Sequence, residues 1–441
     1  MFSSNLAWKL GIASVIILAD VVFSAIPKRD VYYDKVAVIP EVLSEVDANY
    51  YRELSDDEKV QLVENMIALG LEQLDPHSTY ISPREWKQFN EQTEGEFDGI
   101  GIQIEGTNGH LTVVSPLPGT PAYEAGILAN DLIVKINGTS TENMKLNDAV
   151  DKIKGKKGEE ITLTVRHEGE KEPVDIVVVR DKIKVANVLG DRRKPGDEEK
   201  WDYFVDRKTK IGYIRLLQFN KPSPTELRQA VQQLKDDDAR ALILDLRGNP
   251  GGLLDAACDI ANLFVDSGKI VTVRGRNHKE EVHTASADKA VAASADKFPM
   301  AVLIDHDSAS ASEIVAAALQ DHHRATIIGE RSYGKGSVQS LIRLENGRSR
   351  LKLTTAHYWR PSEKNIHREA DSKEDDEWGV KPDIEVLLKR DERAEFRTYR
   401  HDRDKVAGKD KPAPKPDPDL EKDKALKAAI EHLRTKLGKG S

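Results

Sequence analysis

The chain has 441 residues, of which 39% are hydrophobic and 32% are charged, with a net charge of −9. This composition is typical of a soluble globular protein and not of a disordered one, and the length predicts about two to four domains. The negative charge, without any basic cluster, excludes nucleic acid as the main partner.

The N-terminus carries an apolar run. Leu10–Ala25 is mostly apolar, with a basic residue on each side. Its uninterrupted part, Leu10–Ala19, has the length of a signal-peptide core and is too short to span a bilayer. Asp20 suits neither a signal peptide nor an anchor. We expect an exported protein, periplasmic or membrane-anchored facing outside the cytoplasm, with residues 1–27 either cleaved after Ser24 or kept as the anchor.

Residues 28–96 are expected to form an N-terminal helical segment. Apolar residues recur at helical spacing over Val60–Leu74. The phrase LDPHSTY, at Leu74–Tyr80, then ends the helix at a proline. His77 lies within it and is interpreted as a turn residue, not as a catalytic base.

Residues 97–180 change to a β-rich pattern. Alternating isoleucines predict a strand, and the glycines before it allow successive backbone N–H groups to converge on an anion. An exposed sheet edge beside them can accept an extended peptide as an extra strand. The segment resembles a PDZ domain, and the residues similar to its carboxylate-binding loop are Gly99, Ile100, Gly101 and Ile102. A small β-rich domain without a ligand explains the same pattern and stays open.

The core begins after a charged connector, Asp181–Asp206. Strands are expected at Ile211–Phe219 and Ala241–Leu246, and the second is apolar on both faces, as in a covered parallel strand. It runs into Asp245–Gly252 (DLRGNPGG), where adjacent glycines bring backbone donors close to a substrate carbonyl. An ordinary strand-to-helix turn explains this loop equally well. Cys258, the only cysteine, follows in a helical pattern that predicts a buried thiol.

A serine-rich turn follows the buried strand Met300–Ile304. The segment Ser308–Gln320 (SASASEIVAAALQ) then turns into an amphipathic helix. A hydroxyl at a strand-to-helix break lies near exposed N–H groups and the positive end of the helix dipole, where an oxyanion is stabilised. A plain helix cap is the alternative interpretation.

Lys335 lies between two glycines, with Gln339 after it. A serine nucleophile needs a base, and a lysine can serve if it is kept neutral. A solvated loop lysine is the alternative. The segment GERSYGK also fits the start of a phosphate-binding loop, but Gly336 replaces the magnesium-binding Ser or Thr and a strand follows, so nucleotide binding is rejected.

SASASEIVAAALQD followed by GERSYGKGSVQ resembles the C-terminal processing (tail-specific) serine peptidases. The resemblance implies that Ser310 is the nucleophile, Lys335 the general base and Gln339 the residue that orients the lysine. The oxyanion-hole N–H groups that it implies come from Ala311 and from either Gly251 or Gly252.

The resemblance spans roughly Val38–Val386 and implies an α/β (α+β) multi-domain fold. A crotonase-like ββα peptidase core over residues 181–389 would carry the N-terminal helical segment and an inserted PDZ domain. The implied function is serine endopeptidase activity near or at the C-terminal tails of proteins, with the PDZ domain recognising the tail. The implied partners are proteins or peptides with free C-termini, without a cofactor or metal.

The end of the chain departs from that family. Asn365–Glu377 is a charged insert, interpreted as a solvated loop that borders the cleft without touching the dyad. Residues 390–441 are expected to form a charged linker, to about Asp419, and a last helix over Leu420–Leu437.

Two other classes of function remain to be weighed. A tail-binding scaffold with a catalytically silent core would lack a dyad member, and none is missing. A histidine-based hydrolase would use His306, His322 or His323, which are more simply surface residues. No H-E-x-x-H pattern supports metal chemistry. The physiological substrate, the oligomeric state and any adaptor are left open by the sequence.

Overall fold

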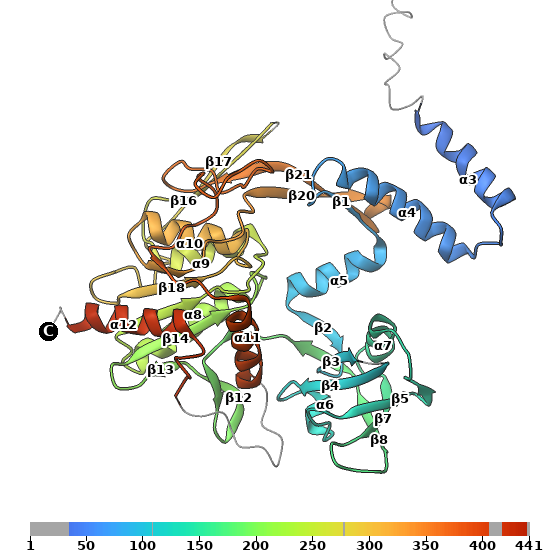
Figure 1. Cartoon of the computed structure of the whole chain (residues 1–441), viewed down its shortest axis with the longest axis horizontal. Coiled ribbons are helices and arrows are strands. Elements are labelled where there is room, and N and C mark those ends of the chain that lie inside the picture. Colours follow the sequence, from blue (N-terminus) through green and yellow to red (C-terminus); the bar gives the residue numbers. More distant parts are fainter. Residues whose placement is uncertain (1–34, 108, 277, 405–416, 439–441) are drawn as a thin grey trace, which may run out of the picture. The chain divides into compact units, whose positions relative to one another are not determined.

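A computed structural model describes residues 35–107, 109–276, 278–404 and 417–438 (Figure 1). The expected signal peptide or anchor over residues 1–27 lies outside this part. Among the described residues, no helix is both long and apolar enough to cross a membrane. The chain divides into two compact units, Met1–Gly70 and Leu71–Ser441.

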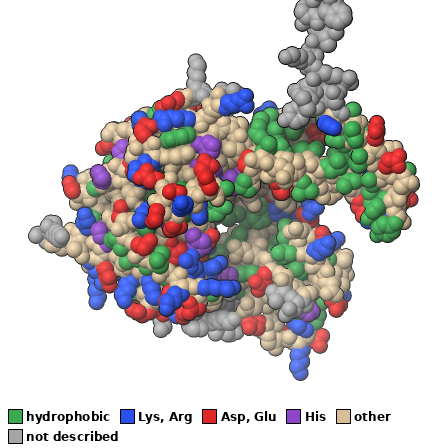
Figure 2. Space-filling model, turned by 45° about the horizontal axis from the view of Figure 1, so that its top comes forward, with side chains coloured by type: hydrophobic (Ala, Val, Ile, Leu, Met, Phe, Trp, Pro, Cys, Tyr) green, Lys and Arg blue, Asp and Glu red, His purple; other side chains and the backbone are tan. Residues whose placement is uncertain are grey.

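The first unit holds α3 (Val38–Asn49) and most of α4 (Asp56–Glu72), and neither helix buries a residue. The helices expected before Pro76 are therefore present. Ser55 caps α4, because its Oγ accepts the Glu58 N–H at 3.3 Å and its own N–H donates to Glu58 Oε2 at 2.9 Å. Hydrophobic side chains gather on the surface of this unit (Figure 2).

The second unit begins with a short strand and a capped helix, α5 (Pro83–Glu94), and continues into a β-rich domain. That domain has a sheet in the order β3-β4-β5-β7-β8, with β6 paired to β5. Its elements are β2 (Glu96–Gly99), β3 (Ile102–Thr107), β4 (His110–Pro116), α6 (Pro121–Glu124), β5 (Leu132–Ile136), β6 (Thr139–Ser140), α7 (Leu146–Ile153), β7 (Glu160–Arg166) and β8 (Val174–Val179). Its buried residues form a hydrophobic cluster of their own.

The peptidase-like core is built on a seven-stranded sheet in the order β10-β14-β15-β18-β19-β22, with β13 paired to β14. Neighbours from β14 to β22 run parallel. The strands are β10 (Val188–Leu189), β13 (Phe204–Asp206), β14 (Ile211–Leu216), β15 (Ala241–Asp245), β18 (Met300–Ile304), β19 (Thr326–Gly329) and β22 (Ile384–Glu385). Every residue of β14, β15 and β18 is buried, as expected for strands covered on both faces.

Helices cover both faces of this sheet (Figure 1). Alternate strand residues such as Ile214 pack against α8 (Ser223–Asp236), α9 (Leu254–Phe264) and α10 (Ala311–Asp321). The residues between them pack against α12 (Lys424–Gly438) on the other face. The period-two alternation of a strand thus divides one sheet between two hydrophobic cores.

A second sheet, in the order β1-β21-β16-β17 with β20 paired to β21, contacts α9 and α10 through β16. Its strands are β1 (Thr79–Ile81), β16 (Lys269–Gly275), β17 (His278–Thr284), β20 (Ser337–Leu344) and β21 (Ser349–Trp359). The LDPHSTY segment expected as a turn therefore enters this sheet. Thr79, Tyr80 and Ile81 of β1 pair antiparallel with β21.

Three expectations are corrected. The charged stretch after residue 390 is not a linker throughout, because α11 (Arg390–Asp404) is a helix. Arg403 on this helix is buried and its Nε donates to Asp191 Oδ1 at 2.9 Å, so ion pairing anchors a helix that apolar patterning does not reveal. The connector after residue 181 contains short strands, namely β9 (Asp181–Lys184), β11 (Arg192–Lys194) and β12 (Asp197–Asp202), besides β10 and β13. Cys258 is only partly buried, and burial raises the pKa of its thiol to about 12.

Candidate active site

Ser310 lies where buried strand β18 gives way to helix α10. It is the N-cap of α10 with φ 55° and ψ −112°, a positive φ that a residue with a side chain rarely adopts. The helix that follows directs its first unpaired N–H groups toward the region in front of this residue. Ser310 is half-buried, whereas its neighbours Ala309 and Ala311 are buried.

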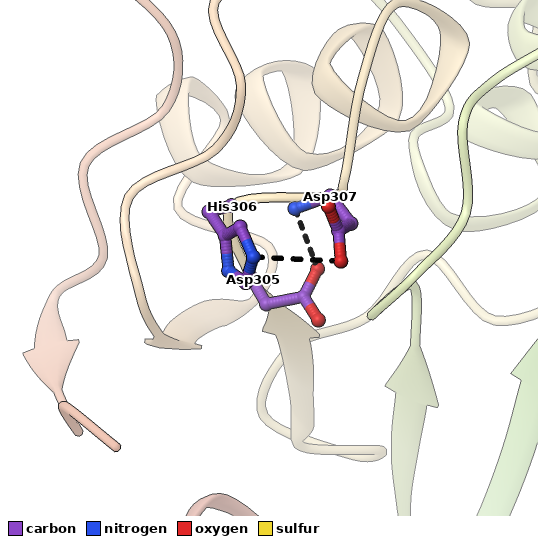
Figure 3. A group of neighbouring side chains, drawn as sticks. All are labelled: Asp305, His306 and Asp307. Atoms are coloured by element: carbon purple, nitrogen blue, oxygen red, sulfur yellow. Dashed lines mark hydrogen bonds and ion pairs between the residues drawn. The ribbon is translucent and has the colours of Figure 1, made fainter. Parts of the chain in front are cut away.

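Asp305 ties the turn before Ser310 to the glycine-rich loop. Figure 3 shows Asp305 with its neighbours His306 and Asp307 in this turn. The Asp305 carboxylate accepts the N–H of Gly248 at 2.9 Å and that of Asp307 at 3.1 Å. Asp305, His306 and Asp307 could together offer three ligand atoms to a metal ion. However, Arg393 Nη1 lies 2.7 Å from His306 Nδ1, and this guanidinium disfavours a second cation there. The structural role therefore explains the cluster better.

The loop DLRGNPGG contacts the Ser310 turn directly. A Cβ on Gly251, whose φ is 101°, would lie 2.9 Å from Ser310 Cβ and 3.0 Å from the Ala311 nitrogen. Gly251 N–H donates to Asn249 Oδ1 at 2.9 Å. Among the described residues, the N–H groups of Gly252 and Ala311 have no acceptor. Only a glycine permits this approach, and it leaves two backbone donors available next to Ser310.

Lys335 lies in the loop between β19 and β20 and is half-buried. Burial and, after it, the charge of Lys352 lower the pKa of Lys335, while Glu313 and Asp75 act in the opposite direction. The structure has no hydrogen bond between the Ser310 hydroxyl and the Lys335 amine, both of which it describes. Proton transfer between them therefore requires the two side chains to approach further.

Glu313, on the first turn of α10, connects the two candidate residues. Its carboxylate is fully buried, with 0% exposure. One oxygen, Oε2, accepts the backbone N–H of Ser310 and that of Lys335, each at 2.8 Å. The other accepts Ser332 Oγ and the Gly334 N–H, each at 2.6 Å. Burial raises the pKa of this carboxyl to about 7, against the opposing effect of its hydrogen bonds.

Two hydrogen bonds hold the Gln339 side chain, and neither of them involves Lys335. Its Nε2 donates to Ser337 Oγ at 2.9 Å and to Thr354 Oγ1 at 3.2 Å. Thr354 Oγ1 in turn donates to Asp75 Oδ1 at 3.0 Å. The chain Asp75–Thr354–Gln339 fixes the amide with its NH₂ group turned toward the sheet.

The charged insert borders the Lys335 loop. Arg368 N–H donates to the Gly334 carbonyl at 2.9 Å, and a Cβ on Gly336 would lie 2.2 Å from the His367 nitrogen. Arg331 and Arg368 both lie over the Trp378 ring, 3.5 Å and 4.3 Å from its centroid. The glycines on either side of Lys335 thus allow the insert to pack closely against this loop, because they have no Cβ atom.

Sequence reasoning missed several members of this site. Glu313 stands inside the serine-rich motif, and a single carboxylate among small and apolar residues was the signal that the sequence offered. His77 lies in a turn, as predicted, and burial and then the charge of Lys335 lower its pKa. No spacing connects Asp75 with Thr354, because only the pairing of β1 with β21 brings them together.

The β-rich domain presents its own candidate site. Gly99 ends β2, and Gly101 has φ 81° with no room for a Cβ, which would lie 2.4 Å from Thr120. The N–H groups of Ile100 and Gly101 have no acceptor within the described part of the chain. Next to them, β3 is an edge strand of its sheet and contacts α7. The four predicted residues therefore form a donor-bearing loop followed by an open strand edge.

Comparison with known proteins defines the family. Peptidase family S41 matches residues 210–386 and the PDZ domain family matches residues 88–166. A carboxy-terminal-processing protease of Bartonella bacilliformis is 42% identical over 359 residues, covering 80% of this chain and 75% of that protein. The carboxy-terminal processing protease CtpA of Bacillus subtilis is 34% identical over 361 residues, covering 81% and 70%.

The chain belongs to the carboxy-terminal processing proteases of peptidase family S41. It is also similar to a solved photosystem II D1 C-terminal processing protease, with 26% identity and a TM-score of 0.42, over 78% of this chain and 86% of that one. The expected mixed α/β fold with a PDZ domain is confirmed. As a member of this family the protein is a C-terminal processing protease.

Proposed function

We propose that this protease is a serine endopeptidase that cleaves proteins near or from their C-terminal tails with Ser310 as nucleophile and Lys335 as general base. The observation that carries the proposal is the shared acceptor, Glu313 Oε2, which holds the backbone of both residues. The half-buried lysine with its lowered pKa supports it further, since a base must be neutral to act.

The chemistry follows from these positions. The neutral Lys335 amine takes the proton of the Ser310 hydroxyl as its oxygen attacks the scissile carbonyl. The resulting oxyanion accepts N–H donors from Gly252 and Ala311, which have no other acceptor in the described chain. Collapse breaks the C–N bond, and the leaving amine takes the proton from Lys335. Water then attacks the acyl ester and loses a proton to Lys335. Collapse breaks the ester C–O bond as the Ser310 oxygen takes that proton back, which restores the hydroxyl and the neutral amine.

Of the two glycines considered for the oxyanion hole, we assign Gly252. The Gly251 N–H is already used by Asn249, at 2.9 Å. Gly251 instead allows the loop to approach Ser310, where a side chain would collide. Gln339 is proposed to orient Lys335 with its carbonyl oxygen, because its amide nitrogen is used by Ser337 and Thr354.

We propose that the PDZ domain binds the C-terminal carboxylate of the substrate at Gly99–Ile102. Two N–H groups without acceptors among the described residues, together with the neighbouring edge strand β3, support this role. A crystallised PDZ domain of a carboxy-terminal protease from Vibrio cholerae, in complex with a peptide, is 30% identical over 20% of this chain. Protein or peptide substrates with free C-termini are then the partners.

Two further parts of the proposal concern location and domain limits. We propose that residues 1–27 direct export and that the protease acts outside the cytoplasm. The test expresses the chain with and without residues 1–27 and measures the mass of the mature protein, which shows where its N-terminus lies. We propose domains with the limits 28–96, 97–180, 181–389 and 390–441.

Cleavage of unfolded proteins tests the proposed activity. The purified protein and its Ser310→Ala variant are incubated with unfolded proteins, and the cut sites are mapped by mass spectrometry. We expect cuts that depend on Ser310 and on an accessible C-terminus. Binding of tails without any cleavage by the wild type would instead support a tail-binding scaffold with a silent core.

A further inference from the structure

A cavity of about 720 Å³ lies at the opposite end of α10 from Ser310. Its walls come from the start of β18 at Met300, the start of β19 at Thr326, the end of α10, the segment after β21 and helix α12. A cavity of this size is large enough for a small organic molecule. The proposed cleavage of the peptide bond at Ser310 makes no use of it.

Arg324, in the turn between α10 and β19, is a buried cation in the wall of this cavity. The residue is only 4% exposed. Its Nε donates to the Ala292 carbonyl at 3.0 Å and its Nη2 to the Phe298 carbonyl at 3.0 Å, so one edge of the guanidinium holds the segment before β18. The third nitrogen, Nη1, has no acceptor within the described part of the chain. Only Nη1 is therefore left for a ligand.

The charge of Arg324 has no carboxylate partner among the described residues. Burial lowers the pKa of Arg324 to about 10, and no acidic neighbour opposes this effect. Of the two acids in the cavity wall, Asp321 accepts Arg360 Nη2 at 2.6 Å through its Oδ1. The other, Asp383, accepts the Ile327 N–H at 2.7 Å. Neutral donors would hold two carbonyls equally well, so a structural role alone does not explain a full charge that is buried without a partner.

Helix α12 adds a second cation to the wall. Lys436 lines the cavity, is exposed, and has no ion pair within the residues that the structure describes. Two histidines, His323 and His432, line the cavity as well. Apart from the Asp321 ion pair, the wall thus holds two positive charges, Arg324 and Lys436, against one carboxylate. This excess of positive charge attracts an anion.

We propose that this cavity binds a phosphate group, as inorganic phosphate or a small phosphate monoester, with Arg324 and Lys436 as its cationic donors. A bidentate pair with a carboxylate needs two nitrogens of one guanidinium, and Arg324 has a single nitrogen left. A phosphate accepts single donors from several directions, and a lysine binds it as a point charge. Met300 and Leu433, which also line the cavity, suit the organic part of a monoester. The site is separate from Ser310 and Lys335 and requires neither of their proposed roles.

Thermal unfolding of the full-length protein in a phosphate titration, at an ionic strength held constant with sodium chloride, tests the site. Phosphate should raise the Tm of the wild type by roughly 2–4 °C with a saturable midpoint, because a ligand that binds only the folded state stabilises it. Ser310→Ala should respond as the wild type does. A parallel titration with glycerol 3-phosphate distinguishes the two sources of the group. Tighter binding than phosphate supports a monoester as the ligand, and weaker binding supports inorganic phosphate.

Two variants connect the response to the cavity. Lys436→Met should shift the midpoint to about tenfold higher phosphate, because it removes a charged donor. Lys424→Met is the matched control, since Lys424 lies on the same helix but pairs with Glu392 at 2.7 Å outside the cavity, and it should keep the wild-type midpoint. Arg324→Gln removes the buried charge and keeps an amide donor for the carbonyls, and it should lose the response.

The other outcomes overturn the proposal. No response of the wild type, or an equal response to added sodium chloride, means that Arg324 only holds the segment before β18. An unchanged midpoint in Lys436→Met or in Arg324→Gln means that phosphate binds elsewhere on the protein. If Arg324→Gln does not fold, the midpoint of Lys436→Met, whose side chain is exposed, decides alone.

Discussion

The backbone N–H groups of Ser310 and Lys335 donate to the same oxygen of Glu313, each at 2.8 Å. A turn at the start of α10 and a loop after β19 thus share one buried acceptor. Because the Glu313 carboxylate is 0% exposed, no water competes for these hydrogen bonds. The two backbones are held to one acceptor even though no hydrogen bond joins the described side chains of Ser310 and Lys335.

Ser310→Ala and Lys335→Ala should each abolish peptide cleavage while the fold stays intact, because each removes a reacting group. Lys335→Arg should also be inactive, since a guanidinium stays protonated and cannot take the serine proton. Gln339→Ala should be less damaging, because it orients the base without replacing it. The measurement is turnover of an unstructured peptide, with circular dichroism as the control for folding. Near-normal turnover by Lys335→Ala would rule out the dyad.

Glu313→Gln should change how stability depends on pH. Burial raises the pKa of the Glu313 carboxyl to about 7 from an ordinary 4.5. Between these values the folded protein holds a proton that the unfolded chain releases, so this stabilisation is complete below pH 4.5 and lost as pH rises through 7. The unfolding free energy of the wild type, relative to Glu313→Gln, should fall by about 3 kcal/mol across the window.

Urea unfolding at several pH values measures this difference. The exposed residue Glu431 supplies the matched control, because Glu431→Gln makes the same chemical change on the surface of α12. Its stability relative to the wild type should be flat over the same pH window. A flat difference for Glu313→Gln as well would mean that the buried carboxyl does not titrate in this range.

Thr354→Val should lower kcat by roughly fivefold with little change in KM. A fivefold loss corresponds to one hydrogen bond of about 1 kcal/mol. The variant keeps the shape and removes the hydroxyl that accepts from Gln339 at 3.2 Å and donates to Asp75 at 3.0 Å. Thr355→Val is the control, because Thr355 Oγ1 lies 2.7 Å from Ser340 Oγ on the other face. Equal losses in both variants would contradict the role of Thr354.

A peptide with a free C-terminal carboxylate and an apolar last residue should bind the Ser310→Ala protein more tightly than its C-terminal amide, by about 1.5–3 kcal/mol. The N–H groups of Ile100 and Gly101, which lack acceptors in the described chain, are the expected donors. Ile102→Asp should weaken binding, and Val177→Asp, on the opposite edge strand β8, should not. Calorimetric titration measures both, and equal affinity for acid and amide would remove the tail-reading role.

Local sequence patterns predicted the main strands and helices of the core and the Ser310 and Lys335 segments of the site. Uninterrupted apolar runs identified β15 and β18, because a strand covered on both faces excludes polar side chains. The small residues around Ser310 and the glycines around Lys335 identified the two segments that meet. These are local signals, since burial, chain reversal and helix initiation each leave a mark within a few neighbouring residues.

Only the tertiary structure decided which distant groups surround the proposed base. Asp75 reaches Thr354 because β1 pairs with β21, and Lys352 shares their face because of the register of that pairing. The helix α11 was likewise hidden, since buried ion pairs such as Arg403 with Asp191 hold it. A one-residue slip in register would turn Lys352 to the opposite face, and nothing in the local pattern of a strand records which partner it will face.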